Sequence, residues 1–109
     1  MIVLCTHAAP TAPLNFVLET VVGFPTQLRA SWSTPDPANG VITEYTLRCT
    51  SDTQPPESFT NLISGNVSSF MLDNLRPYTT YSCNVSATTG DGEGPATEVM
   101  TAQTDEAGL

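Results

Sequence analysis

Apolar residues recur at every second position along much of this chain. Within residues 27–33, for example, Leu28, Ala30 and Trp32 share one face and polar residues occupy the other. A two-residue period is typical of a strand with one buried and one solvated face, whereas a helix repeats its apolar positions every three or four residues. The pattern therefore predicts an all-β domain.

Clusters of Pro, Gly, Asn and Asp interrupt this alternation roughly every 8 to 12 residues, as in sandwiches and barrels. The strands predicted between these clusters are 14–18, 27–33, 42–50, 58–62, 68–72, a long alternation through 81–87, and 97–104. The other residues expected to point inward are Phe16, Leu18, Tyr45, Leu47, Cys49, Phe70, Leu72, Tyr81, Cys83, Val85, Ala87, Met100 and Ala102. The residues expected on the solvated faces include Thr46, Arg48, Ser82, Asn84 and Ser86.

The length of 109 residues suits one domain with a single core. We expect that domain to span residues 13–104. Residues 1–12 are interpreted as a linker or an expression remnant, because the apolar start at 1–4 is shorter than a membrane span or a secretory leader. Residues 105–109 are interpreted as a second linker.

The net charge of −8 excludes some classes of partner. The chain has three arginines, Arg29, Arg48 and Arg76, and no lysine. Nucleic acids and anionic membranes are bound by clustered basic residues, so neither is an expected partner. The one histidine, His7, lies far from any predicted strand, and Cys5 with two distant cysteines lacks the paired spacing of a zinc site. We therefore expect no metal, no cofactor and no catalysis.

The order and spacing of eleven residues resemble those of the fibronectin type III module. They are Pro13, Trp32, Ile42, Tyr45, Leu47, Leu75, Pro77, Tyr81, Val85, Ala87 and Pro95. The resemblance implies a seven-stranded, immunoglobulin-like β-sandwich with strands A, B and E in one sheet and C′, C, F and G in the other. In an immunoglobulin domain the tryptophan lies between two cysteines, whereas here Trp32 precedes both Cys49 and Cys83.

The resemblance also implies a core and one fixed polar contact. The implied core consists of Trp32, Tyr45, Leu47, Leu75, Tyr81, Val85 and Ala87. Trp32 is large enough to fill the centre between two sheets. Tyr81 resembles a tyrosine-corner residue, whose hydroxyl returns to the backbone near residues 74–77.

Two cysteines depart from the family pattern. Cys49 and Cys83 occupy inward positions on the neighbouring strands C and F, where the family usually has tyrosine or an aliphatic residue. They either form a disulfide or remain two buried thiols, and a register slip of two residues decides between the alternatives. Because the cysteine count is odd, Cys5 is left without an intramolecular partner in either case.

Two sequons and two loops are the candidate surface sites. Asn66 and Asn84 each begin an Asn-Val-Ser glycosylation sequon. The B–C loop (34–41) and the F–G loop (88–95) meet at one end of the expected sandwich. Their candidate partner-binding residues are Asp36, Asn39, Gly40, Asp91 and Glu93.

The F–G loop is at the place where one fibronectin module carries an Arg-Gly-Asp integrin motif. Asp91 stands where that arginine would be, so integrin recognition of that type is not expected. Asp91 and Glu93 alone also supply too few oxygens for calcium.

The resemblance implies an interaction and spacing module in the extracellular part of a cell-surface receptor or adhesion protein. The expected partners are other proteins and the adjacent domains of the same chain. The alternative is a purely structural spacer in a tandem array, either intracellular or within a secreted enzyme. A cytokine-receptor module is disfavoured, because no Trp-Ser-x-Trp-Ser pattern precedes the last strand.

Overall fold

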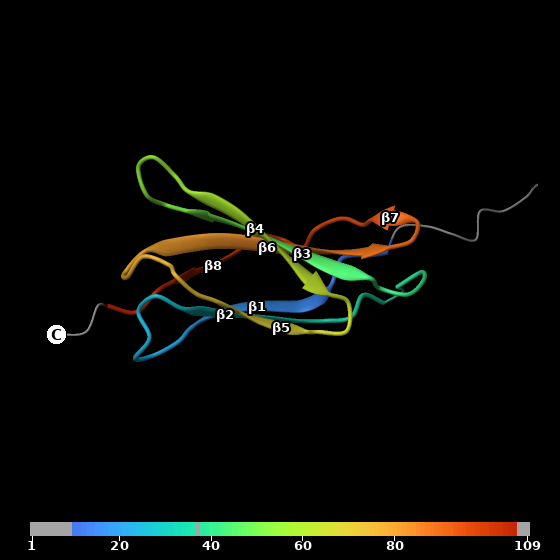
Figure 1. Cartoon of the computed structure of the whole chain (residues 1–109), viewed down its shortest axis with the longest axis horizontal. Coiled ribbons are helices and arrows are strands. Elements are labelled where there is room, and N and C mark those ends of the chain that lie inside the picture. Colours follow the sequence, from blue (N-terminus) through green and yellow to red (C-terminus); the bar gives the residue numbers. More distant parts are fainter. Residues whose placement is uncertain (1–9, 37, 107–109) are drawn as a thin grey trace, which may run out of the picture.

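The computed structural model describes residues 10–36 and 38–106 and shows two antiparallel sheets packed face to face (Figure 1). One sheet has the order β1-β2-β5, and the other has the order β4-β3-β6-β7, with β8 also paired to β6. The strands are β1 (Leu14–Thr20), β2 (Leu28–Ser33), β3 (Glu44–Ser51), β4 (Ser58–Ser64), β5 (Ser69–Leu72), β6 (Thr80–Thr89), β7 (Gly92–Glu93) and β8 (Met100–Gln103). The predicted sandwich is therefore confirmed.

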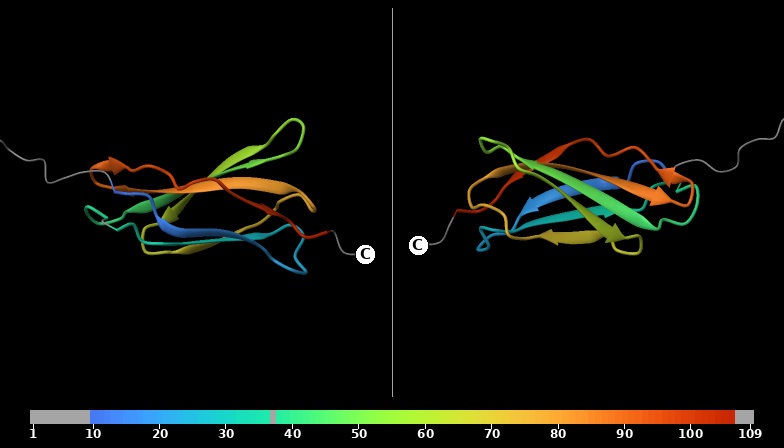
Figure 2. Two further views of the ribbon diagram at one scale, coloured as in Figure 1. Left: turned by 180° about the vertical axis from the view of Figure 1, so that it is seen from behind. Right: turned by 45° about the horizontal axis from the view of Figure 1, so that its top comes forward.

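In the strand letters used above for the fibronectin type III module, β1 to β6 correspond to A, B, C, C′, E and F. Strands β7 and β8 together correspond to G. Cys5, His7, Pro37 and the parts of the expected linkers at 1–9 and 107–109 lie outside the described residues. The two loops that carry the candidate binding residues lie at the same end of the sandwich in every view (Figure 2). We call this the B–C/F–G end, and the other the opposite end.

The core lies between the sheets and is built from the alternating apolar residues. None of the seven core residues implied by the resemblance is more than 8% exposed. The Trp32 ring packs against Tyr45 with the ring centroids 5.2 Å apart. Burying an aromatic side chain of this size contributes about 2–3 kcal/mol, so this pair anchors one sheet on the other.

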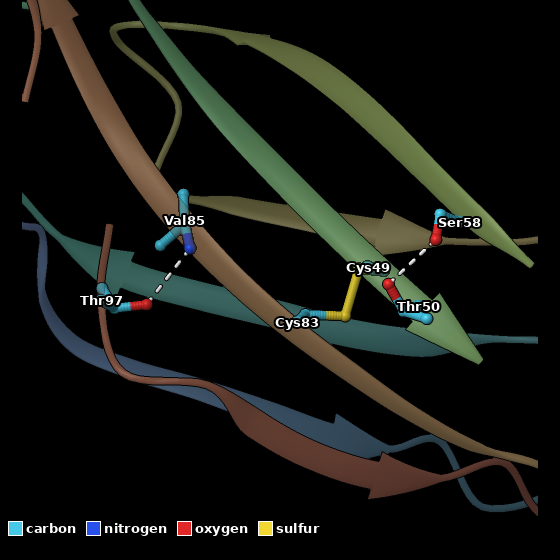
Figure 3. The surroundings of a disulfide bond; sticks show 6 residues. All are labelled: Cys49, Thr50, Ser58, Cys83, Val85 and Thr97. Atoms are coloured by element: carbon cyan, nitrogen blue, oxygen red, sulfur yellow. Dashed lines mark hydrogen bonds between the residues drawn. A yellow bond between two sulfur atoms is a disulfide. The ribbon is translucent and has the colours of Figure 1, made fainter. Parts of the chain in front are cut away.

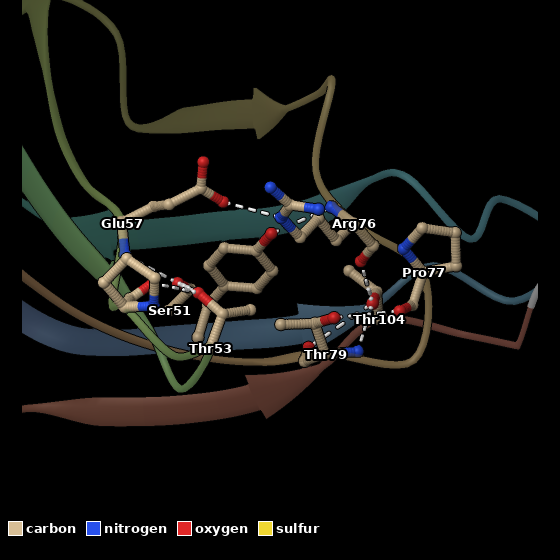
Figure 4. Close-up of polar contacts among 9 residues, drawn as sticks. Ser51, Thr53, Glu57, Arg76, Pro77, Thr79 and Thr104 are labelled. Atoms are coloured by element: carbon tan, nitrogen blue, oxygen red, sulfur yellow. Dashed lines mark hydrogen bonds and ion pairs between the residues drawn. The ribbon is translucent and has the colours of Figure 1, made fainter.

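Polar contacts fix the connection between β5 and β6 (Figure 4). The backbone N–H of Arg76 donates to the Tyr81 hydroxyl at 2.8 Å, within the segment expected for a tyrosine corner. Nearby, the buried Thr104 hydroxyl donates to the Arg76 carbonyl at 2.6 Å and accepts from the Thr79 N–H at 2.9 Å. The residue that follows β8 is thereby tied to the same connection.

The last strand differs from the predicted continuous strand at 97–104. The strand found there, β8, begins only at Met100, and the short strand β7 lies inside the segment predicted as the F–G loop. The carbonyl of Pro10 also lies against Gly94, where a Cβ would be only 2.0 Å from that oxygen. Met100 is in register with the buried Cys83, yet it is 39% exposed because β8 lies at the sheet's edge. Met100 therefore lies on the inward face, as expected, but is only partly covered there.

Candidate functional site

The B–C and F–G loops lie against each other at one end of the sandwich. The Thr43 backbone N–H donates to the Thr88 carbonyl at 2.8 Å, and the Thr43 hydroxyl donates to the same oxygen at 3.1 Å. A Cβ built on Gly40 would meet the Thr89 side chain at 3.5 Å. The two loops therefore form one continuous surface rather than two separate projections.

All five candidate binding residues are exposed in these two loops: Asp36, Asn39, Gly40, Asp91 and Glu93. Asn39 and Gly40 have φ values of 59° and 136°, the conformation that Asn and Gly adopt most readily in a tight turn. The backbone N–H of Asp91 donates to the Thr89 hydroxyl at 3.2 Å, which fixes the turn into the F–G loop.

Sequence reasoning missed Val41, which is 82% exposed beside these residues. Val41 lies within the predicted B–C loop (34–41) but was not among its candidate binding residues, while its neighbour Ile42 packs against the core. Val41, Asp36 and Asp91 are all exposed at this end of the sandwich and give it an acidic and apolar character.

The fifth candidate, Glu93, is engaged within the domain. Its carboxylate accepts from Arg48 Nη1 at 2.8 Å and also from the Ser86 hydroxyl. The hydrogen bond from Arg48, followed by the one from Ser86, holds the pKa of Glu93 below its ordinary value. Glu93 therefore bridges strands of one sheet instead of projecting toward a partner.

The ion pair between Arg48 and Glu93 also reduces the solvent exposure of the sheet's outer face. Thr46 and Ser86 are in register on the face that was expected to be solvated, yet they are only 4% and 1% exposed. The Glu93 carboxylate and the Arg48 guanidinium both hydrogen-bond to Ser86 and cover it. The expectation of a wet outer face was therefore wrong at these two positions.

Cys49 and Cys83 face each other across β3 and β6, and their sulfur atoms form a disulfide (Figure 3). Their Cα atoms are 4.1 Å apart, and both residues are buried. The strands on either side are held by further contacts. The Thr50 and Ser58 hydroxyls bond at 3.1 Å, and the Val85 N–H donates to the Thr97 hydroxyl at 3.1 Å.

The described residues contain no histidine and no group of three or more His, Cys, Asp or Glu side chains placed to hold a metal ion.

A surface hollow of about 420 Å³ between β4 and β5 is lined by Phe59, Phe70 and Leu72. At its rim, Glu57 accepts from Arg76 Nε at 2.7 Å, and this hydrogen bond lowers the Glu57 pKa (Figure 4). Nowhere in residues 10–36 and 38–106 does a helix reach the length and hydropathy needed to cross a bilayer.

A family model described as the fibronectin type III domain matches residues 11–103 of the chain. This chain belongs to the fibronectin type III family.

Relatives of this fibronectin type III domain are far longer than the chain. Human neogenin is 35% identical over 100 residues, which cover 90% of this chain and 7% of neogenin. The Caenorhabditis elegans protein sidekick homolog is 34% identical over 68 residues, which cover 62% of this chain and 3% of that protein. The chain thus spans only a small part of the relatives that it matches.

Solved structures share the fold of this fibronectin type III domain. The third fibronectin III domain of the human KIAA0343 protein aligns with a TM-score of 0.80 at 26% identity, covering 93% of this chain and 87% of that one. The fn3 domain of human contactin 1 aligns with a TM-score of 0.78 at 20% identity, covering 100% and 90% of the two chains. The second likeness shows the fold alone.

Proposed function

We propose that this fibronectin type III domain is a non-catalytic, extracellular protein-interaction module of a larger cell-surface or adhesion protein. The observation that carries the proposal is the joined B–C and F–G surface, which exposes Asp36, Val41 and Asp91. Rigid strands hold these loops in place, and loops held on a rigid scaffold are common binding elements.

The acidic charge of the domain indicates the kind of partner. A net charge of −8 without a single lysine favours proteins that present a basic face. Val41 offers an exposed apolar side chain on this surface, together with the exposed carboxylates of Asp36 and Asp91. Apolar and polar side chains are combined in the same way in many protein–protein interfaces.

Two further features support the extracellular compartment. The Cys49–Cys83 disulfide is a bond that persists in oxidising compartments and is rare in the cytosol. Both glycosylation sequons lie in the domain, and Asn66 is exposed.

Binding measurements on loop variants test the proposal. The chain is screened in multimeric form against an array of purified extracellular protein domains, and the affinity of each hit is measured at physiological salt. The double variant Asp36→Lys with Val41→Ser should weaken binding tenfold or more. The matched control is Asp52→Lys with Val22→Ser, which changes exposed residues at the opposite end and should leave affinity within about twofold.

A pure spacer is the second candidate function, and the opposite end of the sandwich favours it. Val22, Phe24 and Tyr78 are 84%, 56% and 62% exposed there. Asp105 joins their loops, because its carboxylate accepts from the Gly23 N–H and its carbonyl accepts from the Tyr78 N–H. An apolar surface beside the last described strand suits contact with a neighbouring domain. Equal affinity of the loop variant and the wild type would favour this spacer role.

A further inference from the structure

The two glycosylation sequons have the same residues, Asn-Val-Ser, but very different surroundings. One lies in the turn between β4 and β5, and the other lies within β6. We propose that Asn66 carries an N-linked glycan and that Asn84 stays unmodified in the folded domain. This inference rests on the proposed function, because the modification takes place in the secretory pathway.

The Asn66 sequon is accessible along its whole length. Asn66, Val67 and Ser68 are all exposed. The Ser64 hydroxyl donates to Asn66 Oδ1 at 2.6 Å, so the fold engages the oxygen of this amide, whereas the glycan attaches to Nδ2. Both the hydrogen bond and the glycan can therefore be present together.

The turn that carries Asn66 has a fixed position beside the B–C loop. The Gly65 N–H donates to the Thr43 carbonyl at 3.1 Å, and the Val67 N–H donates to the Ser64 carbonyl at 3.0 Å. A Cβ on Gly65 would lie 2.0 Å from the Ile42 carbonyl oxygen, so this close approach requires glycine. A glycan on Asn66 would thus stand next to the proposed binding surface, at the B–C/F–G end.

The Asn84 sequon is built into the middle of the larger sheet. Asn84 is in register with Arg48 on β3, and its Oδ1 is buried without a hydrogen-bond partner. The Ser86 hydroxyl, which completes the sequon, is covered by Glu93 and Arg48. The residue just before the sequon, Cys83, is locked to β3 by the disulfide.

The chemistry of transfer favours the accessible sequon. The Asn Nδ2 attacks the anomeric carbon of a lipid-linked oligosaccharyl pyrophosphate, a new N–C bond forms, and the C–O bond to the pyrophosphate breaks. The lipid pyrophosphate leaves with the electron pair of that bond, and Nδ2 gives up one proton. The enzyme must reach both the amide and the sequon hydroxyl. Pairing of β3 with β6 removes Asn84 and Ser86 from reach, whereas Asn66 remains reachable after folding.

Secretion of the chain from mammalian cells behind a signal peptide tests the site directly. Intact mass is measured before and after peptide N-glycosidase treatment, and peptide mapping locates each Asn that the treatment converts to Asp. The wild type should carry one glycan at Asn66. Asn66→Gln and Ser68→Ala should both lose it, while Ser68→Thr and the control Asn84→Gln should keep it.

A glycan on Asn84, or none on Asn66, would overturn the inference. Ser68→Ala retains Asn66 and its hydrogen bond from Ser64, so it reports on the sequon even where Asn66→Gln disturbs the turn. The signal peptide imposes the compartment, and no partner is involved in the measurement. Its failure is therefore distinguishable from a failure of the proposed function, which the loop variants test separately.

Discussion

The Tyr81 hydroxyl accepts a 2.8 Å hydrogen bond from the backbone N–H of Arg76, five residues earlier in the chain. The ring of Tyr81 is buried against the core, with its residue only 2% exposed. One side chain thus serves both the apolar core and the connection between the two sheets. This connection lies at the opposite end of the domain from the proposed binding surface.

We predict that Tyr81→Phe destabilises the domain by about 1–2 kcal/mol. The substitution keeps the ring but leaves the Arg76 N–H without its acceptor. Urea unfolding followed by tryptophan fluorescence measures the change, because Trp32 lies in the core. Tyr78→Phe is the matched control. Tyr78 is 62% exposed, so loss of its hydroxyl should change stability by less than about 0.5 kcal/mol. Equal effects of the two substitutions would contradict the role of the Tyr81 hydroxyl.

The disulfide should contribute a large part of the domain's stability. Cys49 and Cys83 are separated by 34 positions, and a crosslink that closes a loop of this size contributes about 3–4 kcal/mol in the chain-entropy model. The variant with both cysteines changed to alanine should therefore unfold at a clearly lower urea concentration. Reduced wild-type protein should lose a similar amount, and a loss below about 1 kcal/mol in both would contradict the prediction.

The ion pair between Arg48 and Glu93 should make stability depend on pH. The folded domain holds the Glu93 pKa below its unfolded value, so ionised Glu93 stabilises the fold above the unfolded pKa. That stabilisation is lost as the pH falls through the lower, folded pKa. Glu57 and Asp105, whose pKa values are also lowered, should act in the same direction.

Thermal melting of Glu93→Gln tests this dependence. The midpoint of the wild type should fall from neutral pH into the acid range, and the variant should show a smaller fall. Glu98→Gln, which removes one negative charge at another exposed position, controls for the change in net charge. Identical slopes for all three proteins would exclude a role for Glu93 in the acid dependence.

Adding a methyl group at Gly94 should destabilise the domain. A Cβ at this position would lie 2.0 Å from the Pro10 carbonyl oxygen, so backbone must move to admit it. We predict that Gly94→Ala costs about 1–3 kcal/mol of stability. Gly90→Ala provides a control in the same hairpin, because a Cβ there meets nothing within 4 Å. Chemical denaturation of both variants should therefore separate them clearly.

The alternation of side chains made the core and most strands predictable from sequence. Trp32, Leu47 and Val85 follow the two-residue period, and burial of apolar faces enforces that period. The register between β3 and β6 was not predictable in this way. A slip of two residues keeps every side chain on its face, so the pattern cannot tell whether Cys49 lies opposite Cys83.

The ion pair was hidden from sequence reasoning for a different reason. Arg48 and Glu93 are 45 positions apart in the sequence. Alternation places Arg48 on a solvated face and Glu93 in a loop, and the two side chains meet only because the F–G hairpin folds back over the sheet. The exposure of Met100 was hidden for a third reason. Alternation correctly gives its inward face, but its exposure depends on the edge of the sheet, which alternation does not reveal.

The redox state of the protein in its own tissue tests the extracellular assignment most directly. Free thiols are trapped by alkylation at the moment of lysis or collection, and intact mass is compared before and after reduction. Reduction should expose two further thiols, and peptide mapping should assign them to Cys49 and Cys83. Alkylation of both cysteines without reduction would contradict an extracellular, disulfide-bonded module.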